Sequence, residues 1–341
     1  MPAIPSAFTP PLLLRPAWLQ TITPSLFRRL QPPVGRSENL ELPDGDFLEL
    51  EWHAPERSEL LIASHGLEGS LESSYMIGLT RTLLASGYGV LTWNMRGCGR
   101  VRNRLPTWYH SGQSEDLRAV VSHALQKTSS TISLLGISVG GNITLKYLGE
   151  ESGAVSGRLR SAIAVSVPMD LRASADTLAT AKNAIYMQYL LRPLRARMLE
   201  KKSRFPGLFD LTGLSSIRTF HEFDRRFTAP MHGFASVDDY WDRSSSIHFA
   251  PSIRIPTLLI SSLDDPFLSP SCFPHSIALK NPNLFLETPA HGGHVGFIES
   301  LDLEQTWLDR RAAAFFNEYH RERLPDELLK NRVGNSDSTG R

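Results

Sequence analysis

A pentapeptide in the middle of the chain has the residue types of a nucleophilic serine site. Gly136-Ile137-Ser138-Val139-Gly140 follows an apolar run and opens an amphipathic stretch. A serine nucleophile of this kind lies on a tight strand-to-helix turn, where side chains two residues before and after it would clash. The pattern and its flanks therefore predict that Ser138 is a nucleophile. The alternative is a glycine-rich turn that contains a serine by chance.

A serine hydroxyl is a weak nucleophile at its ordinary pKa, so a base and an orienting acid are required. After such a turn they are expected in the order Asp, then His. Asp264-Asp265-Pro266 follows one apolar run and His291-Gly-Gly-His294 follows the next. Open α/β sheets place ligands at the carboxyl ends of their strands, where both segments would lie. We expect His294 to be the base and one of the two aspartates to orient it.

The oxyanion formed during acyl transfer needs two backbone donors. One comes from the residue after the serine, here Val139, and one from the loop after an earlier strand. The loop HGLEGS at 65–70 follows a predicted strand, and its glycines let the backbone turn its amides inward. The N–H of Leu67 is the candidate for the second donor. His65 is expected to be a structural hydrogen-bonding residue of this loop rather than a second base.

The elements that must position these residues alternate from about residue 46. Expected strands are Phe47–Trp52, Leu60–Ser64, Gly89–Asn94, Thr131–Ile137, Ser161–Val167, Thr257–Ser262 and Asn283–Glu287. Expected helices are Met76–Ser86, Glu115–Gln126, Gly140–Gly149 and Glu304–His320. Buried parallel strands have such nearly continuous apolar runs. The alternation predicts an α/β fold with a mostly parallel central sheet that is flanked by helices.

The alternation stops between residues 168 and 251, where helical patterns such as Ala173–Leu191 replace the strands. A connection of this length within a compact domain is uncommon unless it forms a lid or subdomain. We expect an inserted helical cap at 168–251 and a core formed by 46–167 and 252–325. Residues 1–45 are expected to form an N-terminal lead-in segment. Residues 326–341 are polar and are expected to be a disordered tail.

The composition excludes some classes of function. The 36 Lys and Arg residues nearly balance 35 Asp and Glu residues, which gives no general attraction for nucleic acid. Two cysteines, Cys98 and Cys272, are too few for a disulfide scaffold and predict a cytoplasmic location. No run approaches the roughly 20 apolar residues that a membrane span requires. The N-terminal apolar run Leu12–Leu14 lies between prolines and makes a poor signal peptide.

Six sequence blocks together carry a family resemblance. They are HGLEGS at 65–70, NMRGCG at 94–99, YHSGQSED at 109–116, GISVGGN at 136–142, DDPF at 264–267 and HGGHVGF at 291–297. With Trp18-Leu19-Gln20-Thr21, they resemble the YheT-like α/β-hydrolases, a family of bacterial esterases related to eukaryotic α/β-hydrolase-domain lipases. The resemblance implies the α/β-hydrolase fold, a triad of Ser138, Asp265 and His294, and hydrolysis of short-chain carboxylic esters or acylglycerols.

The form of the acid loop also distinguishes between the paired aspartates. The acid is expected in a segment of the form small-x-x-Asp, and Ser262-Leu263-Asp264-Asp265 fits that form with Asp265 as the acid. Asp264 is then expected to shape the loop through hydrogen bonds to its own backbone.

Two other groups of residues could carry chemistry. Arg96, His110 and Asp116 could bind a ligand, although a polar network that shapes the loops near the serine is the simpler expectation. Cys98 would be a candidate nucleophile only with a histidine beside it.

The segment Lys182–Arg204 has seven basic residues and one acidic residue, interleaved with apolar ones. Such a segment can make peripheral contact with anionic lipid. The alternative is a cap helix with a solvated basic face, and Pro193 is expected to interrupt that helix.

The main hypothesis is a serine esterase that needs no cofactor or metal and acts on a small-molecule ester or acylglycerol. A lipase or thioesterase for longer acyl chains is the second possibility. A catalytically silent binding module with the same fold is the third.

Overall fold

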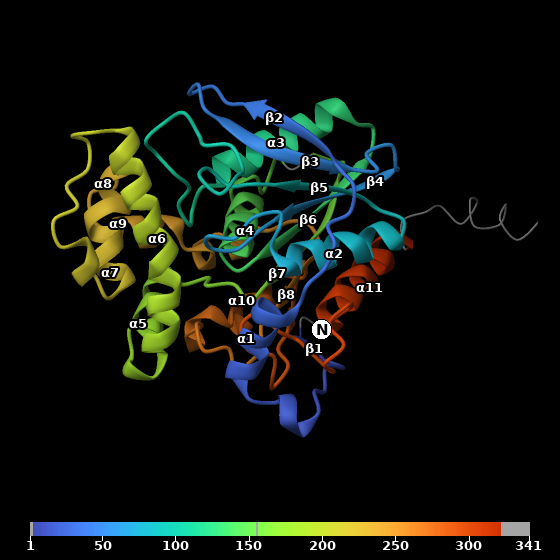
Figure 1. Ribbon diagram of the computed structural model, residues 1–341. Helices are drawn as coiled ribbons and strands as arrows, with labels where there is room; N and C mark the ends of the chain where they lie inside the picture. The colour runs from blue at the N-terminus through green and yellow to red at the C-terminus, as the bar shows by residue number, and fades with distance from the viewer. Residues whose placement is uncertain (1–2, 155, 322–341) are drawn as a thin grey trace, which may run out of the picture.

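The computed structural model describes residues 3–154 and 156–321 (Figure 1). Its sheet has nine strands within the described residues, in the order β1-β9-β8-β7-β6-β4-β5-β3-β2. The strands are β1 (Ala3–Ile4), β2 (Arg36–Glu41), β3 (Phe47–His53), β4 (Glu59–Ser64), β5 (Gly89–Trp93), β6 (Thr131–Ile137), β7 (Leu159–Val165), β8 (Thr257–Ile260) and β9 (Leu284–Glu287). In this order, the neighbouring strands from β1 across the sheet as far as β5 pair in parallel. β3 pairs antiparallel with both β5 and β2. The prediction of a mostly parallel sheet is confirmed.

All seven predicted strands form, but β1 and β2 were not predicted from the sequence. The sequence of β2, RSENLE, has no apolar run because the strand lies at the sheet edge and four of its six residues are exposed. Its pairing with β3 could not be seen from local pattern. The predicted tail 326–341 and the last residues of the predicted core, 322–325, lie outside the described residues.

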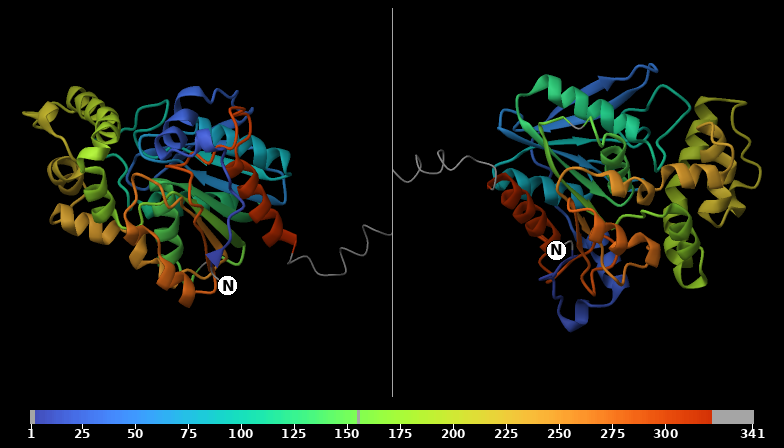
Figure 2. Two further views of the ribbon diagram at one scale, coloured as in Figure 1. Left: turned by 90° about the horizontal axis from the view of Figure 1, so that it is seen from below. Right: turned by 180° about the vertical axis from the view of Figure 1, so that it is seen from behind.

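The strands bury side chains on both faces of the sheet, as their period of two requires. In β4, Leu60 and Ile62 pack into one hydrophobic cluster while Leu61 and Ala63 pack into another. The first cluster is completed by α3 (Ser114–Lys127), α4 (Val139–Glu150) and α10 (His275–Lys280). The second is completed by α2 (Ser74–Ala85) and α11 (Trp307–Arg321), and α1 (Ala17–Phe27) contacts α2. Two helical layers therefore cover the sheet (Figure 2).

The chain between β7 and β8 contains α5 (Leu171–Leu178), α6 (Ala184–Arg204), α7 (Phe220–Phe223), α8 (Ala229–Met231) and α9 (Val237–Ser244). These helices gather on one side of the molecule (Figures 1 and 2). They have hydrophobic clusters of their own, centred on residues such as Leu191, Met198 and Trp241. We call residues 168–251 the helical insertion.

Two details of the insertion differ from the sequence prediction. The predicted helix Ala173–Leu191 is divided into α5 and α6, because the Asn183 side chain bonds the Thr177 and Pro266 carbonyls at the turn between them. Pro193 does not interrupt α6, and that expectation was wrong. The helix loses one hydrogen bond at Pro193. It continues because its buried residues on both sides of the proline pack into one cluster.

Among the described residues, no helix combines the length and apolar character that crossing a membrane requires.

Candidate active site

Ser138 lies in the turn between β6 and α4 with φ 53° and ψ −117°, a conformation that side chains rarely adopt. Glycines allow the chain to pack this closely. A Cβ on Gly136 would lie 2.4 Å from the Gly140 carbonyl oxygen, and one on Gly140 would lie 2.5 Å from the Ser64 carbonyl oxygen. The Ser138 N–H donates to the Val165 oxygen at 2.8 Å. The spacing of the two glycines is therefore a packing requirement of the turn.

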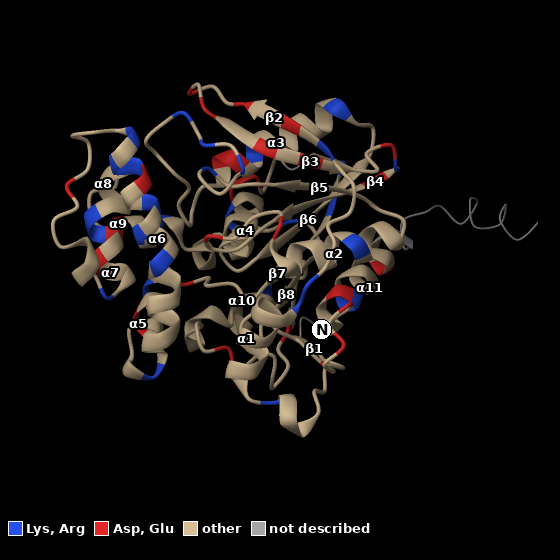
Figure 3. Ribbon diagram, viewed as in Figure 1, with Lys and Arg blue, Asp and Glu red and all other residues tan. Residues whose placement is uncertain are grey.

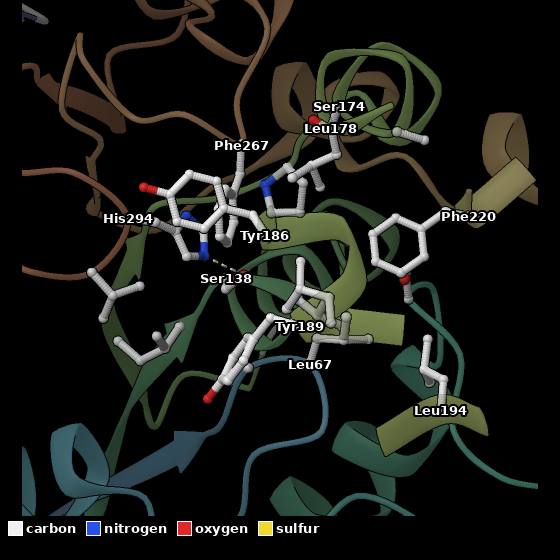
Figure 4. Close-up of a pocket in the computed structure, with 18 of the residues that line it drawn as sticks. Leu67, Ser138, Ser174, Leu178, Tyr186, Tyr189, Leu194, Phe220, Phe267 and His294 are labelled. Carbon is white, nitrogen blue, oxygen red and sulfur yellow. Dashed lines mark hydrogen bonds between the residues drawn. The ribbon is translucent and has the colours of Figure 1, made fainter. Parts of the chain in front are cut away.

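Of the three residues predicted as a triad, His294 lies within hydrogen-bond distance of both Ser138 and Asp265 (Figure 4 shows Ser138 and His294). Nε2 of His294 is 3.0 Å from Ser138 Oγ, and Nδ1 is 2.9 Å from Asp265 Oδ2. The Asp265 side chain is 0% exposed and that of His294 is 12% exposed. An ionised carboxylate only accepts, so Nδ1–H donates to it and Nε2 is free to accept from the serine hydroxyl.

The two aspartates have different contacts. Asp265 also accepts the Phe267 N–H at 2.9 Å, and the Phe267 ring stacks on the His294 ring with centroids 4.2 Å apart. Asp264 accepts the Gly293 N–H at 2.9 Å. Asp264 thus shapes a loop, as expected. The hydrogen bond goes to the backbone of the histidine loop, however, whereas the sequence predicted bonds to the backbone around Asp264 itself.

The N-terminal segment holds the histidine loop, which the sequence patterns alone did not indicate. Gln20 exchanges two hydrogen bonds with the backbone of Ile298, and Thr21 Oγ1 accepts the His294 N–H at 3.0 Å. The contact is close, because a Cβ on Gly293 or Gly296 would lie within 2.5 Å of α1 backbone oxygens. The glycines of HGGHVG and the distant Gln20-Thr21 pair were the available signal.

The two candidate oxyanion donors line the same pocket as Ser138. Val139 is the first residue of α4, so its N–H has no acceptor within its own helix. The loop that carries Leu67 comes close to the serine, since a Cβ on Gly66 would lie 3.3 Å from Ser138 Cβ. The Gly66 N–H donates to the Tyr75 hydroxyl at 2.9 Å, which fixes the start of that loop.

The residue after Leu67 is tied to the helical insertion. Glu68 has φ 52°, and its two carboxylate oxygens each lie 2.8 Å from Nη2 of Arg197 on α6. Tyr109 receives the Glu68 N–H at 2.7 Å, and its hydroxyl lies 3.0 Å from Glu68 Oε1. Arg197 and Glu68 are nearly buried. A salt bridge from the insertion therefore holds the loop that carries the Leu67 amide.

Part of the basic face of α6 is thus not solvated, contrary to the expectation. Lys201 is buried and donates to the Leu105 and Thr107 carbonyls, and Lys202 donates to the Phe209 carbonyl. Lys201 therefore connects the insertion to a loop of the core, whereas Lys202 connects two segments of the insertion. Lys182, Arg192 and Lys202 are exposed, so another part of the basic face is solvated (Figure 3 shows blue segments along α6).

Of the second predicted group, two residues form a network. Arg96 makes paired 2.8 Å hydrogen bonds to Asp116 and also bonds Asp44. His110 lies apart from them, among the rings of His232, Phe234 and Tyr240. Burial, together with nearby His232, holds the pKa of His110 well below its usual value.

Cys98 lacks the environment of a nucleophile. Burial raises the pKa of its thiol to about 12, and the side chain contacts Arg197. It therefore stays protonated at neutral pH.

The pocket above Ser138 has a volume of about 370 Å³. Its walls are mainly apolar and include Trp108, Leu178, Leu194 and Phe223. Tyr186 and Tyr189 of α6 lie over the serine side of the pocket (Figure 4). An apolar pocket of this volume with a few polar groups is typical of a small-molecule site.

The comparison with known families agrees with this architecture. The family described as "alpha/beta hydrolase fold" matches residues 59–301. The chain belongs to this family. The resemblance inferred from the sequence blocks is confirmed: the chain is 34% identical to "Putative esterase YheT" of Escherichia coli (strain K12) over 315 residues, which cover 88% of this chain and 90% of YheT.

Other relatives are more distant. "Phospholipase ABHD3" of Homo sapiens is 29% identical over 82% of this chain and 71% of its own length. A "Monoacylglycerol lipase" of Saccharomyces cerevisiae is 29% identical over 77% of this chain and 60% of its own length. Among solved structures, an esterase of Pyrococcus furiosus superposes with a TM-score of 0.56 at 18% identity, covering 86% of this chain and 98% of the esterase. That likeness shows the shared fold.

His65 gives a test of the loop that follows β4. Its Nδ1 lies 2.8 Å from the Gly66 carbonyl, and its Nε2 accepts the Met95 N–H at 3.0 Å. The contact with Met95 requires an unprotonated Nε2 and therefore the neutral ring, and burial lowers the pKa of His65 to about 4. A folded-state pKa below the unfolded value of 6.5 means that protonation favours the unfolded chain, so the stability from His65 is present above pH 6.5 and lost as the pH falls towards 4.

We expect the free energy of unfolding to decrease between pH 6.5 and 4, with a His65 share on the order of 3 kcal/mol. Denaturant unfolding of the protein and of His65→Asn across this range measures that share. The variant should be less stable at pH 8 and should depend less on pH. Equal pH dependence in both proteins would show that the charge of His65 is not linked to folding.

Proposed function

We propose that this protein is a serine carboxylic ester hydrolase that cleaves short-chain esters or acylglycerols through Ser138, His294 and Asp265. The observation that carries the proposal is the connected contact from Asp265 through His294 to Ser138 Oγ at the floor of an apolar pocket. The names of the relatives, esterase, phospholipase and monoacylglycerol lipase, fit a carboxylic ester hydrolase.

In the proposed mechanism, Ser138 Oγ attacks the ester carbonyl carbon while its proton moves to His294 Nε2. Asp265 keeps Nδ1 of His294 protonated and stabilises the imidazolium that forms. The amides of Leu67 and Val139 donate to the oxyanion. His294 then gives its proton to the leaving alcohol, and an acyl-enzyme remains on Ser138. Water then attacks the acyl carbonyl carbon while His294 takes its proton. The bond between the acyl group and Ser138 Oγ breaks, the acid leaves, and His294 returns the proton to Ser138 Oγ.

The helical insertion acts as a cap in this proposal. Its apolar side chains form the wall of the pocket opposite the sheet, and they exclude water from the acyl group. Arg197 positions the Leu67 amide through Glu68. A cytoplasmic location stays a prediction from the two cysteines, both of which are free thiols in the structure.

A series of p-nitrophenyl esters tests the activity. Each methylene that enters the apolar pocket contributes about 0.8 kcal/mol, so kcat/KM should rise from acetate through the medium chains until the pocket is full. Ser138→Ala should lower turnover by at least about 10³-fold without loss of fold. Activity that survives in this variant would contradict the proposal. A maximum at the longest chains would instead identify a long-chain lipase.

The paired aspartates offer a matched test of the acid. Asp265→Asn keeps the side-chain shape but reverses the hydrogen bond to His294, which costs about 10⁴-fold in turnover in a serine protease triad. Asp264→Asn retains an oxygen that can accept the Gly293 N–H, so it should lose far less. Steady-state kinetics of both variants measure the difference. If Asp264→Asn is inactive and Asp265→Asn is active, the acid has been assigned to the wrong residue.

A further inference from the structure

Large hydrophobic side chains are exposed over a short N-terminal stretch. Leu12 is 73% exposed and Leu13 is 86% exposed in the 3-10 helix η1 (Leu12–Leu14), and Trp18 and Phe27 are 56% and 68% exposed on α1. Surface leucines that occur singly are common, but a gathering of this kind marks an interaction site.

This stretch is continuous with the mouth of the active-site pocket. Residues Ile22 and Leu26 of α1 line the pocket, and so do Ile185 and Tyr189 of α6, which are also highly exposed. Helix α1 from the N-terminal segment and helix α6 from the insertion therefore form two apolar edges of the pocket entrance, which we call the mouth. We define the mouth surface as η1, α1 and the exposed face of residues 184–192 on α6.

The formal charges within the two segments of the mouth surface and their flanks have one sign. The sequence has no Asp or Glu before Glu38, and none between Lys182 and Leu199. Both segments contain arginines, of which Arg29 and Arg192 are exposed, as is Lys182. Arg28 is not available, because it is buried against Asp309. The surface therefore combines exposed apolar side chains with cations and has no carboxylate in its own segments.

We propose that the mouth surface docks on an anionic lipid surface, so that substrate enters the pocket from the lipid. Apolar side chains that insert at the headgroup boundary and cations that meet anionic headgroups are the two components of such binding. A second copy of this chain fits less well. A two-fold interface places the same patch on both sides, which would bring these cations together with no carboxylate from the same segments between them.

Trp18 is a natural probe of this docking. The sequence contains six tryptophans, and the other five are at most 7% exposed. A blue shift of the fluorescence and its quenching by brominated lipid would therefore report the environment of Trp18. The full chain carrying Ser138→Ala is used, so that the vesicles are not hydrolysed.

We expect a blue shift and quenching with phosphatidylcholine vesicles that contain phosphatidylglycerol, a much weaker signal with phosphatidylcholine alone, and a loss of signal as salt is raised. Leu13→Asp should weaken vesicle binding at least tenfold. Leu279→Asp is the matched control, because Leu279 is 76% exposed on α10 and does not line the pocket. This control should bind like the parent protein.

Three results would overturn the proposal: no binding at low salt, equal loss in both variants, or a stable dimer that Leu13→Asp dissociates. The idea of substrate entry rests on the proposed function, whereas the Trp18 signal does not require hydrolysis. If the protein does not hydrolyse esters, the proposed function fails, but the proposal of lipid docking is unaffected. In an otherwise unchanged chain, Leu13→Asp should hydrolyse a soluble p-nitrophenyl ester at the parent rate, which separates loss of docking from loss of activity.

Discussion

The site depends on one constraint, which is the tight turn at Ser138. The turn requires close packing of α4 against the ends of β4 and β6, and only glycine fits at positions 136 and 140. This packing places the serine hydroxyl above the sheet, opens the first amides of α4 towards the pocket, and brings the loop after β4 next to the serine. The positive φ of Ser138 is maintained because the surrounding sheet and helix determine the path of the chain on both sides.

Two segments outside the sheet complete the site. The N-terminal segment holds the histidine loop through Gln20 and Thr21, and the helical insertion holds the Leu67 loop through Arg197 and Glu68. Both contacts are formed by residues far apart in the sequence. The proposed nucleophile, Ser138, is thus positioned by local geometry, whereas its proposed partners depend on tertiary contacts.

That division explains what the sequence could predict. The strands from β3 to β9 were predictable because buried strands have apolar runs. The positions of Ser138, Asp265 and His294 at strand ends were predictable because each follows one of these runs, whereas their catalytic roles stay a prediction. The edge strand β2, the buried Arg197 and the role of Thr21 were not predictable. Their positions follow from a strand pairing, an ion pair and a hydrogen bond between distant segments, and such contacts leave no periodic pattern in the sequence. A proline in a helix interior normally kinks or ends the helix. In α6 the continuous packing of buried residues on both sides of Pro193 outweighs that effect.

The most direct test of the central claim is covalent labelling with a fluorophosphonate, followed by mass spectrometry of the digested protein. An activated serine attacks the phosphorus, fluoride leaves, and one phosphonyl group remains on the oxygen. The account predicts one adduct per chain, on the peptide that contains Ser138, and a much slower reaction in Asp265→Asn. An unlabelled chain, or an adduct on another residue, would contradict the assignment of Ser138 as the nucleophile.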